Sequence, residues 1–196
     1  MTTPKYALEE RERRFLVAEL PSDEPWATRS IADLYIEGSR VRLRRNEGIV
    51  NGQPELVFKL TQKVPSPNGV LGHRGYLTTM YLDAAEYEIF RVLSGDWLDK
   101  TRLSFPPMGV DVFGGPLAGL MIAEAEFDDD DAMSAFVPPT WCGREITDVP
   151  SMTGANLARI SKLPPIEAAA ALGDALVGTP NCDSFEKGHT ATDVSS

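Results

Sequence analysis

A run of alternating charges near the start of the chain, Glu10-Arg11-Glu12-Arg13-Arg14, most restricts the folds open to this sequence. Side chains of a β-strand alternate between two faces, so Glu10, Glu12 and Arg14 would share one face. Charges are rarely buried without partners, because desolvation costs several kcal/mol or more. That face must therefore meet water, a metal ion or opposite charges. Taken alone, the run also fits a solvated helix turn or an exposed strand face, and only its repetition later in the chain argues against that interpretation.

The same alternation of charged and apolar side chains returns in later segments, which we expect to be strands. They comprise residues 40–45, 56–63, 98–105, 109–113 and 120–127, with further strands over 6–17, 30–36 and 76–82. Strands with one charged and one apolar face predict a closed β structure with a water-filled interior and helices on its outer surface. An ordinary small barrel fills its interior with apolar side chains, so this barrel would be inside out.

The predicted interior contains both acids and bases. The acids are Glu10, Glu12, Asp111, Glu124 and Glu126, and the bases are Arg14, Arg42, Arg44, Lys59, Lys100 and Arg102. Carboxylates are hard ligands that suit Mg²⁺ or Mn²⁺, and these ions also bind phosphate oxygens. Arginines bind phosphates through two N–H groups at once, and lysines act as point charges. The mixture therefore predicts a polyanion bound together with its metal, whereas an all-basic interior would bind phosphate without one.

Local signals predict the turns and helices around these strands. Asn46-Glu47-Gly48 and Asn51-Gly52 are typical of hairpin turns. Asp83 followed by Glu86 predicts an N-capped helix that runs to about Leu93, with Phe90 and Leu93 buried. Further helices are expected over residues 132–136, 151–160 and 166–176.

The length of 196 residues fits one domain with a tail. The pair Pro164-Pro165 is expected to end this domain, so the division is 1–164 for the barrel domain and 165–196 for a C-terminal helix and tail. The polar composition of residues 179–196 predicts disorder. Deleting them should leave the melting temperature and the activity nearly unchanged.

The net charge of −10 excludes most general nucleic-acid binders, because such a surface repels phosphodiester backbones. Cys142 and Cys182 lie far apart without a metal-ligand pattern, as expected of a reduced cytoplasmic protein. We see no signal-peptide core and no apolar run long enough to span a bilayer, so no membrane partner is expected. The oligomeric state is left open between monomer and homodimer.

The ordered set of motifs resembles the CYTH superfamily, the triphosphate tunnel metalloenzymes. The segments that carry the resemblance lie within about residues 6–160 and are Glu10–Val17, Arg42–Arg44, Phe58-Lys59, Lys100–Arg102, Val110–Phe113, Gly119-Leu120, Ala123–Phe127 and Gly143–Thr147. The resemblance implies an α+β fold built on a closed eight-stranded antiparallel β-barrel, or tunnel, with peripheral helices. It also implies dependence on a divalent metal and triphosphate substrates.

Carried across by position, the resemblance assigns roles to the interior residues. Glu10, Glu12, Glu124 and Glu126 would hold the metal, with Glu12 and Arg14 next to the reaction itself. Asp111 would either join the metal ligands or pair with an arginine of the tunnel. The phosphates would be bound by Arg42, Arg44, Lys59, Lys100 and Arg102.

The activity expected first is metal-dependent hydrolysis of inorganic triphosphate to pyrophosphate and phosphate. Adenylate cyclase and thiamine triphosphatase activities occur in the same superfamily and are the enzymatic alternatives. A polyphosphate- or nucleotide-binding module without catalysis is the alternative from another functional class.

Three departures from the family pattern imply weaker catalysis, and those at Arg14, Thr79 and Tyr81 favour the non-catalytic binding module. Arg14 stands where lysine is usual, Thr79-Met80-Tyr81 where many inorganic triphosphatases have Glu-Tyr-Glu, and Gly109 where an acid often precedes the strand aspartate. Fewer acids would weaken a second metal site, change the substrate preference or lower the activity. An arginine would also place the attacking water less well than a lysine, because its guanidinium is bulkier.

Overall fold

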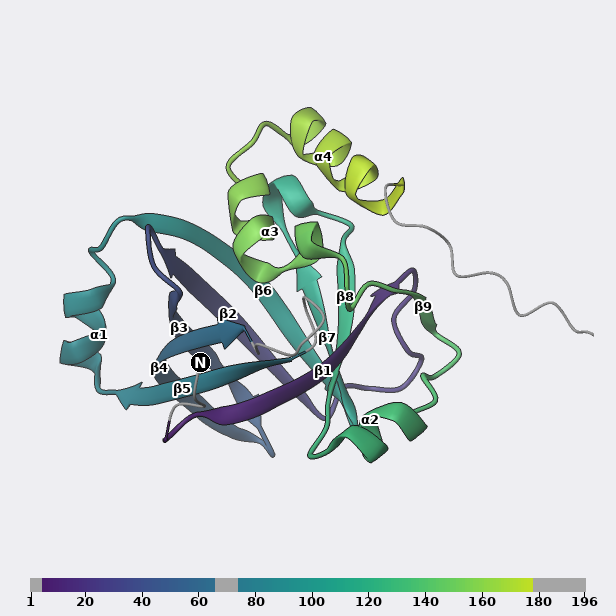
Figure 1. Ribbon diagram of the computed structural model, residues 1–196, viewed down its shortest axis with the longest axis horizontal. Coiled ribbons are helices and arrows are strands. Elements are labelled where there is room, and N and C mark those ends of the chain that lie inside the picture. Colours follow the sequence, from purple (N-terminus) through teal and green to yellow (C-terminus); the bar gives the residue numbers. More distant parts are fainter. Residues whose placement is uncertain (1–4, 66–73, 178–196) are drawn as a thin grey trace, which may run out of the picture.

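The computed structural model describes residues 5–65 and 74–177 (Figure 1). Its strands are β1 (Leu8–Val17), β2 (Ala27–Ile36), β3 (Val41–Val50), β4 (Gln53–Pro65), β5 (Arg74–Leu82), β6 (Gly95–Phe105), β7 (Met108–Phe113), β8 (Met121–Glu126) and β9 (Cys142–Glu145). Its helices are α1 (Ala84–Phe90), α2 (Asp130–Ala135), α3 (Gly154–Ile160) and α4 (Pro165–Val177), with short 3₁₀ turns η1 (Gly115–Leu117) and η2 (Pro150–Met152).

The first eight strands form a closed antiparallel barrel. The strand order is β5-β4-β3-β2-β6-β7-β8-β1, and β1 pairs with β5 to close the ring. The short strand β9 adds to β1 outside this ring. The predicted fold class, a closed eight-stranded barrel with peripheral helices, is therefore confirmed.

The register of the strands places the charged rows on one surface. Residues directly opposite each other in an antiparallel pair share a face. Such pairs are Glu12 with Glu126, Arg102 with Asp111, and Arg44 with Lys59. Because the same face continues from strand to strand around the ring, the charged rows together form the inner wall of the barrel.

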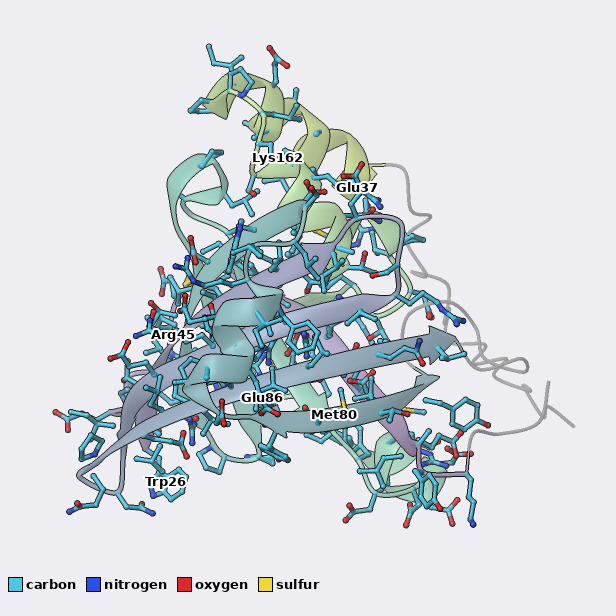
Figure 2. The ribbon with its side chains drawn as sticks, turned by 90° about the vertical axis from the view of Figure 1, so that its left-hand side faces the viewer. Trp26, Glu37, Arg45, Met80, Glu86 and Lys162 are labelled. Atoms are coloured by element: carbon cyan, nitrogen blue, oxygen red, sulfur yellow. The ribbon has the colours of Figure 1, made fainter. Side chains whose placement is uncertain are left out.

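Apolar side chains of the strands are covered from outside by the helices. Helix α1 packs on β4 and β5, and its Tyr87 is buried in one cluster with Leu34 of β2 and Leu43 of β3. Figure 2 shows α1, marked by Glu86, in front of the sheet. On another part of the outer surface, Phe15 and Val110 belong to an apolar cluster that Phe136 and Trp141 help to cover. This burial supplies the apolar stabilisation that the charged interior does not.

The C-terminal elements cap one end of the barrel. Leu98, Phe113 and Ile122 face inward there and form one buried cluster with Met152 and Leu157. In Figure 1, α3 and α4 lie together at this end, away from α1 and α2. The charged wall is therefore bounded at this end by an apolar plug.

Of the two predicted turns between β3 and β4, only one exists. Asn51 and Gly52 both have positive φ, 51° and 73°, and form the hairpin turn as predicted. The Asn46-Glu47-Gly48 signal was wrong, because these residues continue β3. Gly48 is needed there for close packing: a Cβ at this position would lie 2.1 Å from the carbonyl oxygen of Thr28 on β2.

The predicted cap of α1 is confirmed, but the helix is shorter than expected. The Asp83 carboxylate accepts a hydrogen bond from the Glu86 backbone N–H, and the Glu86 carboxylate accepts one from the Asp83 N–H. The helix ends at Phe90, and Leu93 is 44% exposed because it lies in the turn before β6. The expected burial of Leu93 was therefore wrong.

The remaining predicted helices are present, and only their bounds differ from the prediction. The segment 151–160 divides into η2 and α3, and α4 covers the helix expected at 166–176. Within the described ranges, no helix is both long enough and apolar enough to cross a membrane. The tail 179–196 lies outside the described residues, so the effect of its deletion and the division at residue 164 stay predictions.

Candidate active site

All of the predicted site residues lie on the inner wall of the barrel. The wall has three charged groups, formed around Glu12, around Asp111 and around a third acid, Asp33, which sequence reasoning missed. Each group combines carboxylates with arginines or lysines from different strands. The acids and bases are therefore interleaved rather than separated into two surfaces.

The first group consists of Glu10 and Glu12 on β1, Glu126 on β8 and Lys63 on β4. Glu12 stands directly opposite Glu126. The Lys63 ammonium forms an ion pair with Glu10 and lies 3.5 Å from Glu12. Burial, followed by the nearby charges of Glu124 and Glu10, raises the pKa of Glu12 to about 7. The carboxylates are therefore close enough to repel one another, and Lys63 only partly compensates.

The second group surrounds Asp111 on β7, whose side chain is 1% exposed. Asp111 accepts hydrogen bonds from Arg102 at 2.6 and 2.7 Å and from Lys100. The same Arg102 guanidinium also contacts Glu124 on β8. Burial opposes ionisation of Glu124, but Arg102 and then Lys100 outweigh it and lower its pKa. Glu124 is therefore a carboxylate already bound to a guanidinium, which fits the interpretation in which Asp111 pairs with an arginine.

The third group joins β2, β3 and β4. The two oxygens of Asp33 accept hydrogen bonds from Arg44 at 2.6 and 2.7 Å, and the Nε of Arg42 lies 3.6 Å from Oδ1 of Asp33. Lys59 stands opposite Arg44, and its Nζ lies 5.1 Å from the centre of the Tyr81 ring. Arg42, Arg44 and Lys59 form the basic row of the wall. A buried acid lies on one side of this row and an exposed aromatic ring on the other.

Two glycines allow the long basic side chains to cross a neighbouring strand. Gly109 on β7 lies between β6 and β8, and a Cβ there would be 3.2 Å from Cδ of Arg102. Gly75 on β5 lies between β4 and β1, and its Cβ would be 3.1 Å from Cε of Lys63. Because neither glycine has a side chain, Arg102 can reach Glu124 and Lys63 can reach Glu10, each two strands away.

Arg14 is buried beside Glu12 and faces the cap. Its guanidinium donates hydrogen bonds to the carbonyl oxygens of Met152 at 2.9 Å and Thr147 at 3.2 Å. Its Nε lies 3.7 Å from Glu12. The residue thus lies next to the acidic group, as its strand position predicts, and it also ties this group to the C-terminal segment.

Lys63 and Asp33 are the functional candidates that sequence reasoning missed. Lys63 carried a signal, because it shares a strand face with Lys59 and Thr61. Asp33 carried no such sequence signal, because the strand 30–36 shows a single acid among apolar neighbours. The role of Asp33 depends on the pairing of β2 with β3, which sets it directly opposite Arg44.

The donor chemistry of the wall fits a divalent metal, although the ligands are not preassembled. Among the described residues, no three acidic, histidine or cysteine side chains already converge as a metal site. Glu10 and Glu12 nevertheless offer hard oxygen donors beside Glu126, and the buried Oε2 of Glu10 contacts Lys63 without a hydrogen bond of normal geometry. A cation bound there would relieve the carboxylate repulsion that, after burial, raises the pKa of Glu12.

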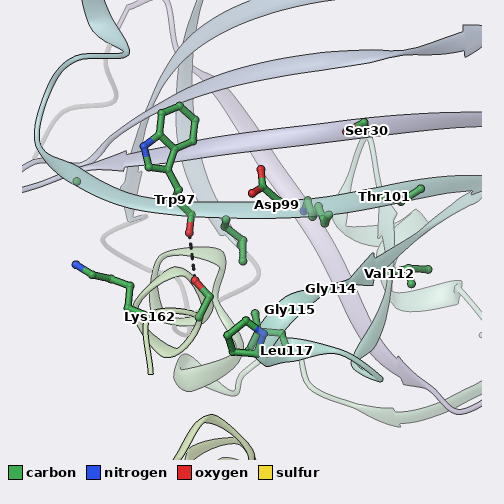
Figure 3. A pocket seen from close by; sticks show the side chains of 14 residues that line it. Ser30, Trp97, Asp99, Thr101, Val112, Gly114, Gly115, Leu117 and Lys162 are labelled. Carbon is green, nitrogen blue, oxygen red and sulfur yellow. Dashed lines mark hydrogen bonds between the residues drawn. The ribbon is translucent and has the colours of Figure 1, made fainter. Parts of the chain in front are cut away.

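A separate pocket of about 550 Å³ lies outside the barrel, between β6, η1 and the end of α3 (Figure 3). Trp97 and Lys162 line it, and the Ser161 hydroxyl donates to the Trp97 carbonyl oxygen at 3.2 Å. Trp97 and Thr101 belong to the outward face of β6, which alternates with the inward Arg102. The pocket therefore opens on the outer side of β6, and Lys100 of the charged wall is also among its lining residues.

Comparison with known proteins identifies relatives over most of the chain. No family model matches the sequence. An inorganic triphosphatase of Nitrosomonas europaea is 33% identical over 149 residues, covering 71% of this chain and 89% of the relative. An inorganic triphosphatase of Acetivibrio thermocellus is 39% identical over 66 residues, covering 32% of this chain and 41% of that protein.

The solved structures agree with the sequence relatives. A crystal structure of the inorganic triphosphatase NE1496 matches with a TM-score of 0.50 and 28% identity, covering 79% of this chain and 96% of that one. A second crystal structure, described as the hypothetical protein NE1496, also has a TM-score of 0.50, at 29% identity and with 79% and 99% coverage. With the barrel topology and the Nitrosomonas relative, these matches show that the chain belongs to the CYTH superfamily, the triphosphate tunnel metalloenzymes.

Proposed function

We propose that this protein hydrolyses inorganic triphosphate to pyrophosphate and phosphate with the help of Mg²⁺ or Mn²⁺. The observation that carries the proposal is the meeting of Glu10, Glu12 and Glu126 with basic side chains on one inner wall. Relatives named inorganic triphosphatase support the choice of substrate. We further propose a cytoplasmic enzyme, monomeric or homodimeric, that acts on a small molecule and not on nucleic acid.

The charge balance of the wall supports a requirement for metal. In the three charged groups, seven bases face inward: Arg14, Arg42, Arg44, Lys59, Lys63, Lys100 and Arg102. The same groups contain six acids: Glu10, Glu12, Asp33, Asp111, Glu124 and Glu126. Arg29 and Glu55 share this face, but they pair with each other at 2.7 Å and cancel. Seven minus six leaves a surplus of one positive charge, which is too small to neutralise a triphosphate. A bound divalent cation supplies the missing charge and polarises the phosphoryl oxygens.

The carboxylates divide between two roles in this proposal. Glu10, Glu12, Glu124 and Glu126 would hold the metal, and Glu124 must exchange Arg102 for it. Asp111 stays with Lys100 and Arg102, whose positions it fixes through hydrogen bonds. We therefore assign Asp111 to orienting the basic side chains rather than to the first set of ligands.

The basic residues bind the substrate and neutralise charge that develops on the transferred phosphoryl group. Arg42, Arg44 and Lys59 form one part of this surface, and Lys100 with Arg102 form the other. Glu12 is placed to orient the attacking water, and Arg14, 3.7 Å from Glu12, holds that carboxylate in position. In-line attack then releases phosphate and leaves pyrophosphate on the basic row.

A single assay tests the proposal and its alternatives. Purified protein is given triphosphate, ATP or thiamine triphosphate with Mg²⁺ or Mn²⁺, and phosphate, pyrophosphate and cyclic AMP are measured. Phosphate released fastest from triphosphate supports the proposal. Cyclic AMP from ATP would establish a cyclase instead, and tight binding of triphosphate without turnover would establish a binding module.

A further inference from the structure

Asp33 is an acid in the middle of the basic row. Its side chain is fully buried, and both of its oxygens accept hydrogen bonds from the Arg44 guanidinium, through Nε and Nη2. Arg42, the other arginine of β3 on this wall, lies 3.6 Å from the same carboxylate. Both arginines are substrate-binding residues in the function proposed above, so the inference below rests on that proposal.

The ion pair between Asp33 and Arg44 is maintained at neutral pH, because Asp33 stays ionised in the folded protein. Burial alone would raise the pKa of Asp33, but Arg42 and Arg44 outweigh burial and lower it to about 2. Asp33 is therefore ionised at neutral pH, and it cancels one of the two arginine charges. A carboxylate bound to a guanidinium through two parallel hydrogen bonds also fixes the plane of that guanidinium.

The geometry determines which part of Arg44 can meet a substrate. A guanidinium has five N–H groups, and Asp33 engages one at Nε and one at Nη2. Three N–H groups remain for phosphate oxygens, two at Nη1 and one at Nη2. An arginine without this partner would offer the Nε–Nη2 edge as well, and it would bind simple anions more tightly.

We propose that Asp33 is a positioning residue for the substrate-binding arginines. It holds Arg44, and through charge Arg42, in one orientation before the substrate arrives. It also removes enough positive charge from the wall that triphosphate is retained only together with its metal. Productive in-line geometry is thereby favoured over tight binding of the free anion.

The test compares Asp33→Asn with wild-type protein in two measurements. Calorimetric titration with tripolyphosphate in the presence of a chelator reports binding without metal, and Asp33→Asn should bind about tenfold more tightly, as expected for one charge removed from partly buried surroundings. With saturating Mg²⁺, kcat should fall by about tenfold or more while KM does not rise, because orientation is lost and attraction is not. A purely structural role of Asp33 would lower stability without this opposite movement of affinity and kcat.

Asp99→Asn is the matched control, because Asp99 is an exposed acid on the outward face of β6 and the net charge changes equally. It should leave both measurements at wild-type values. A folded Asp33→Asn that binds metal-free tripolyphosphate no more tightly than this control, or that keeps wild-type kcat, overturns the proposal.

Asp33→Glu separates the effect of the carboxylate's position from the effect of its charge. It also provides a test if Asp33→Asn does not fold. It keeps the charge but displaces the carboxylate, so metal-free affinity should stay at the wild-type value while kcat falls. Wild-type kcat in Asp33→Glu would overturn the positioning role. If the wild-type protein itself fails to hydrolyse triphosphate, the proposed function fails, and the metal-free titrations still decide whether Asp33 restrains anion binding.

Discussion

The guanidinium of Arg14 donates a hydrogen bond to the carbonyl oxygen of Met152 over 2.9 Å, joining the first strand to the segment that caps the barrel. The Arg14 backbone N–H also donates to the Thr147 hydroxyl at 3.0 Å. One residue therefore contacts both the acidic group, through Glu12, and the cap. A change at Arg14 should affect stability and catalysis together, and the two effects can be measured separately.

Arg14→Lys should lower the free energy of unfolding by about 1–2 kcal/mol, because an ammonium cannot satisfy both carbonyl oxygens in the same geometry. Urea unfolding measures this loss. Arg45→Lys is the control on the outer surface, where Arg45 pairs with a 52% exposed Glu47 and the loss should be smaller. Equal stability of Arg14→Lys and wild type would mean that Arg14 does not hold the cap.

The same Arg14→Lys protein tests the catalytic role. If Arg14 replaces a lysine at a cost in rate, kcat with triphosphate should rise and affinity should stay roughly unchanged. If Arg14 is a phosphate clamp, affinity should fall, since the two-pronged contact is lost. Steady-state kinetics at saturating Mg²⁺ and again at saturating Mn²⁺ separates these outcomes. Unaltered kcat and affinity would remove Arg14 from both roles.

Glu126→Gln should weaken metal activation strongly while the protein stays folded. Glu126 stands opposite Glu12, and glutamine keeps its shape but removes its charge. The concentration of Mg²⁺ for half-maximal activity should rise by about tenfold or more, and Mg²⁺ should raise the melting temperature less than in wild type. Glu47→Gln, at an exposed site next to Arg45, is the control. The same Mg²⁺ dependence in Glu126→Gln and wild type would exclude Glu126 from the metal site.

Gly154→Ala should destabilise the cap. A Cβ at Gly154 would lie 1.9 Å from the hydroxyl oxygen of Tyr35 and 2.9 Å from its Cζ, so the partly buried ring must move. The expected loss of unfolding free energy is about 1–3 kcal/mol, and adding Tyr35→Phe should restore part of it. Gly173→Ala, where no atom lies within 4 Å of the new Cβ, should be neutral or slightly stabilising. A wild-type melting temperature for Gly154→Ala would contradict the packing of Tyr35 against the cap.

The stabilisation that Asp33 provides through its ion pairs should be lost in acid. Its pKa falls from 3.8 to about 2 on folding, so the unfolded chain binds its proton first as the pH falls. The stabilisation is present in full above pH 3.8 and is lost as the pH falls through about 2. It amounts to about 2 kcal/mol. Urea unfolding from pH 5 to pH 2 should show a steeper loss in wild type than in Asp33→Asn, and parallel curves would contradict the ion pair.

The alternation of charged and apolar residues was enough to predict an inside-out barrel. Side chains alternate strictly along a strand, so the sequence 10–14 already assigned Glu10, Glu12 and Arg14 to one face. Local backbone signals were equally informative where one chemical reason dominated, as in the Asp83 cap and the Asn51-Gly52 turn. The outer apolar faces then fixed which side had to be covered by helices.

Local patterns failed where a distant strand decided the outcome. Gly48 looks like a turn residue in the sequence, but it serves the close approach of Thr28. The sequence around Gly48 contains no information about the strand that packs there. The prediction for Leu93 failed for a local reason, because α1 ends at Phe90 and the chain then turns into β6.

The sequence by itself determined which side chains face the interior, because that depends only on a period of two residues. The tertiary structure decided which of them meet: Arg102 with Glu124 across Gly109, Lys63 with Glu10 across Gly75, and Asp33 with Arg44. Those contacts depend on strand order and register around the closed ring, which no single strand encodes. The physical reason is that electrostatic pairing acts over a few ångströms in space, whatever the separation along the chain.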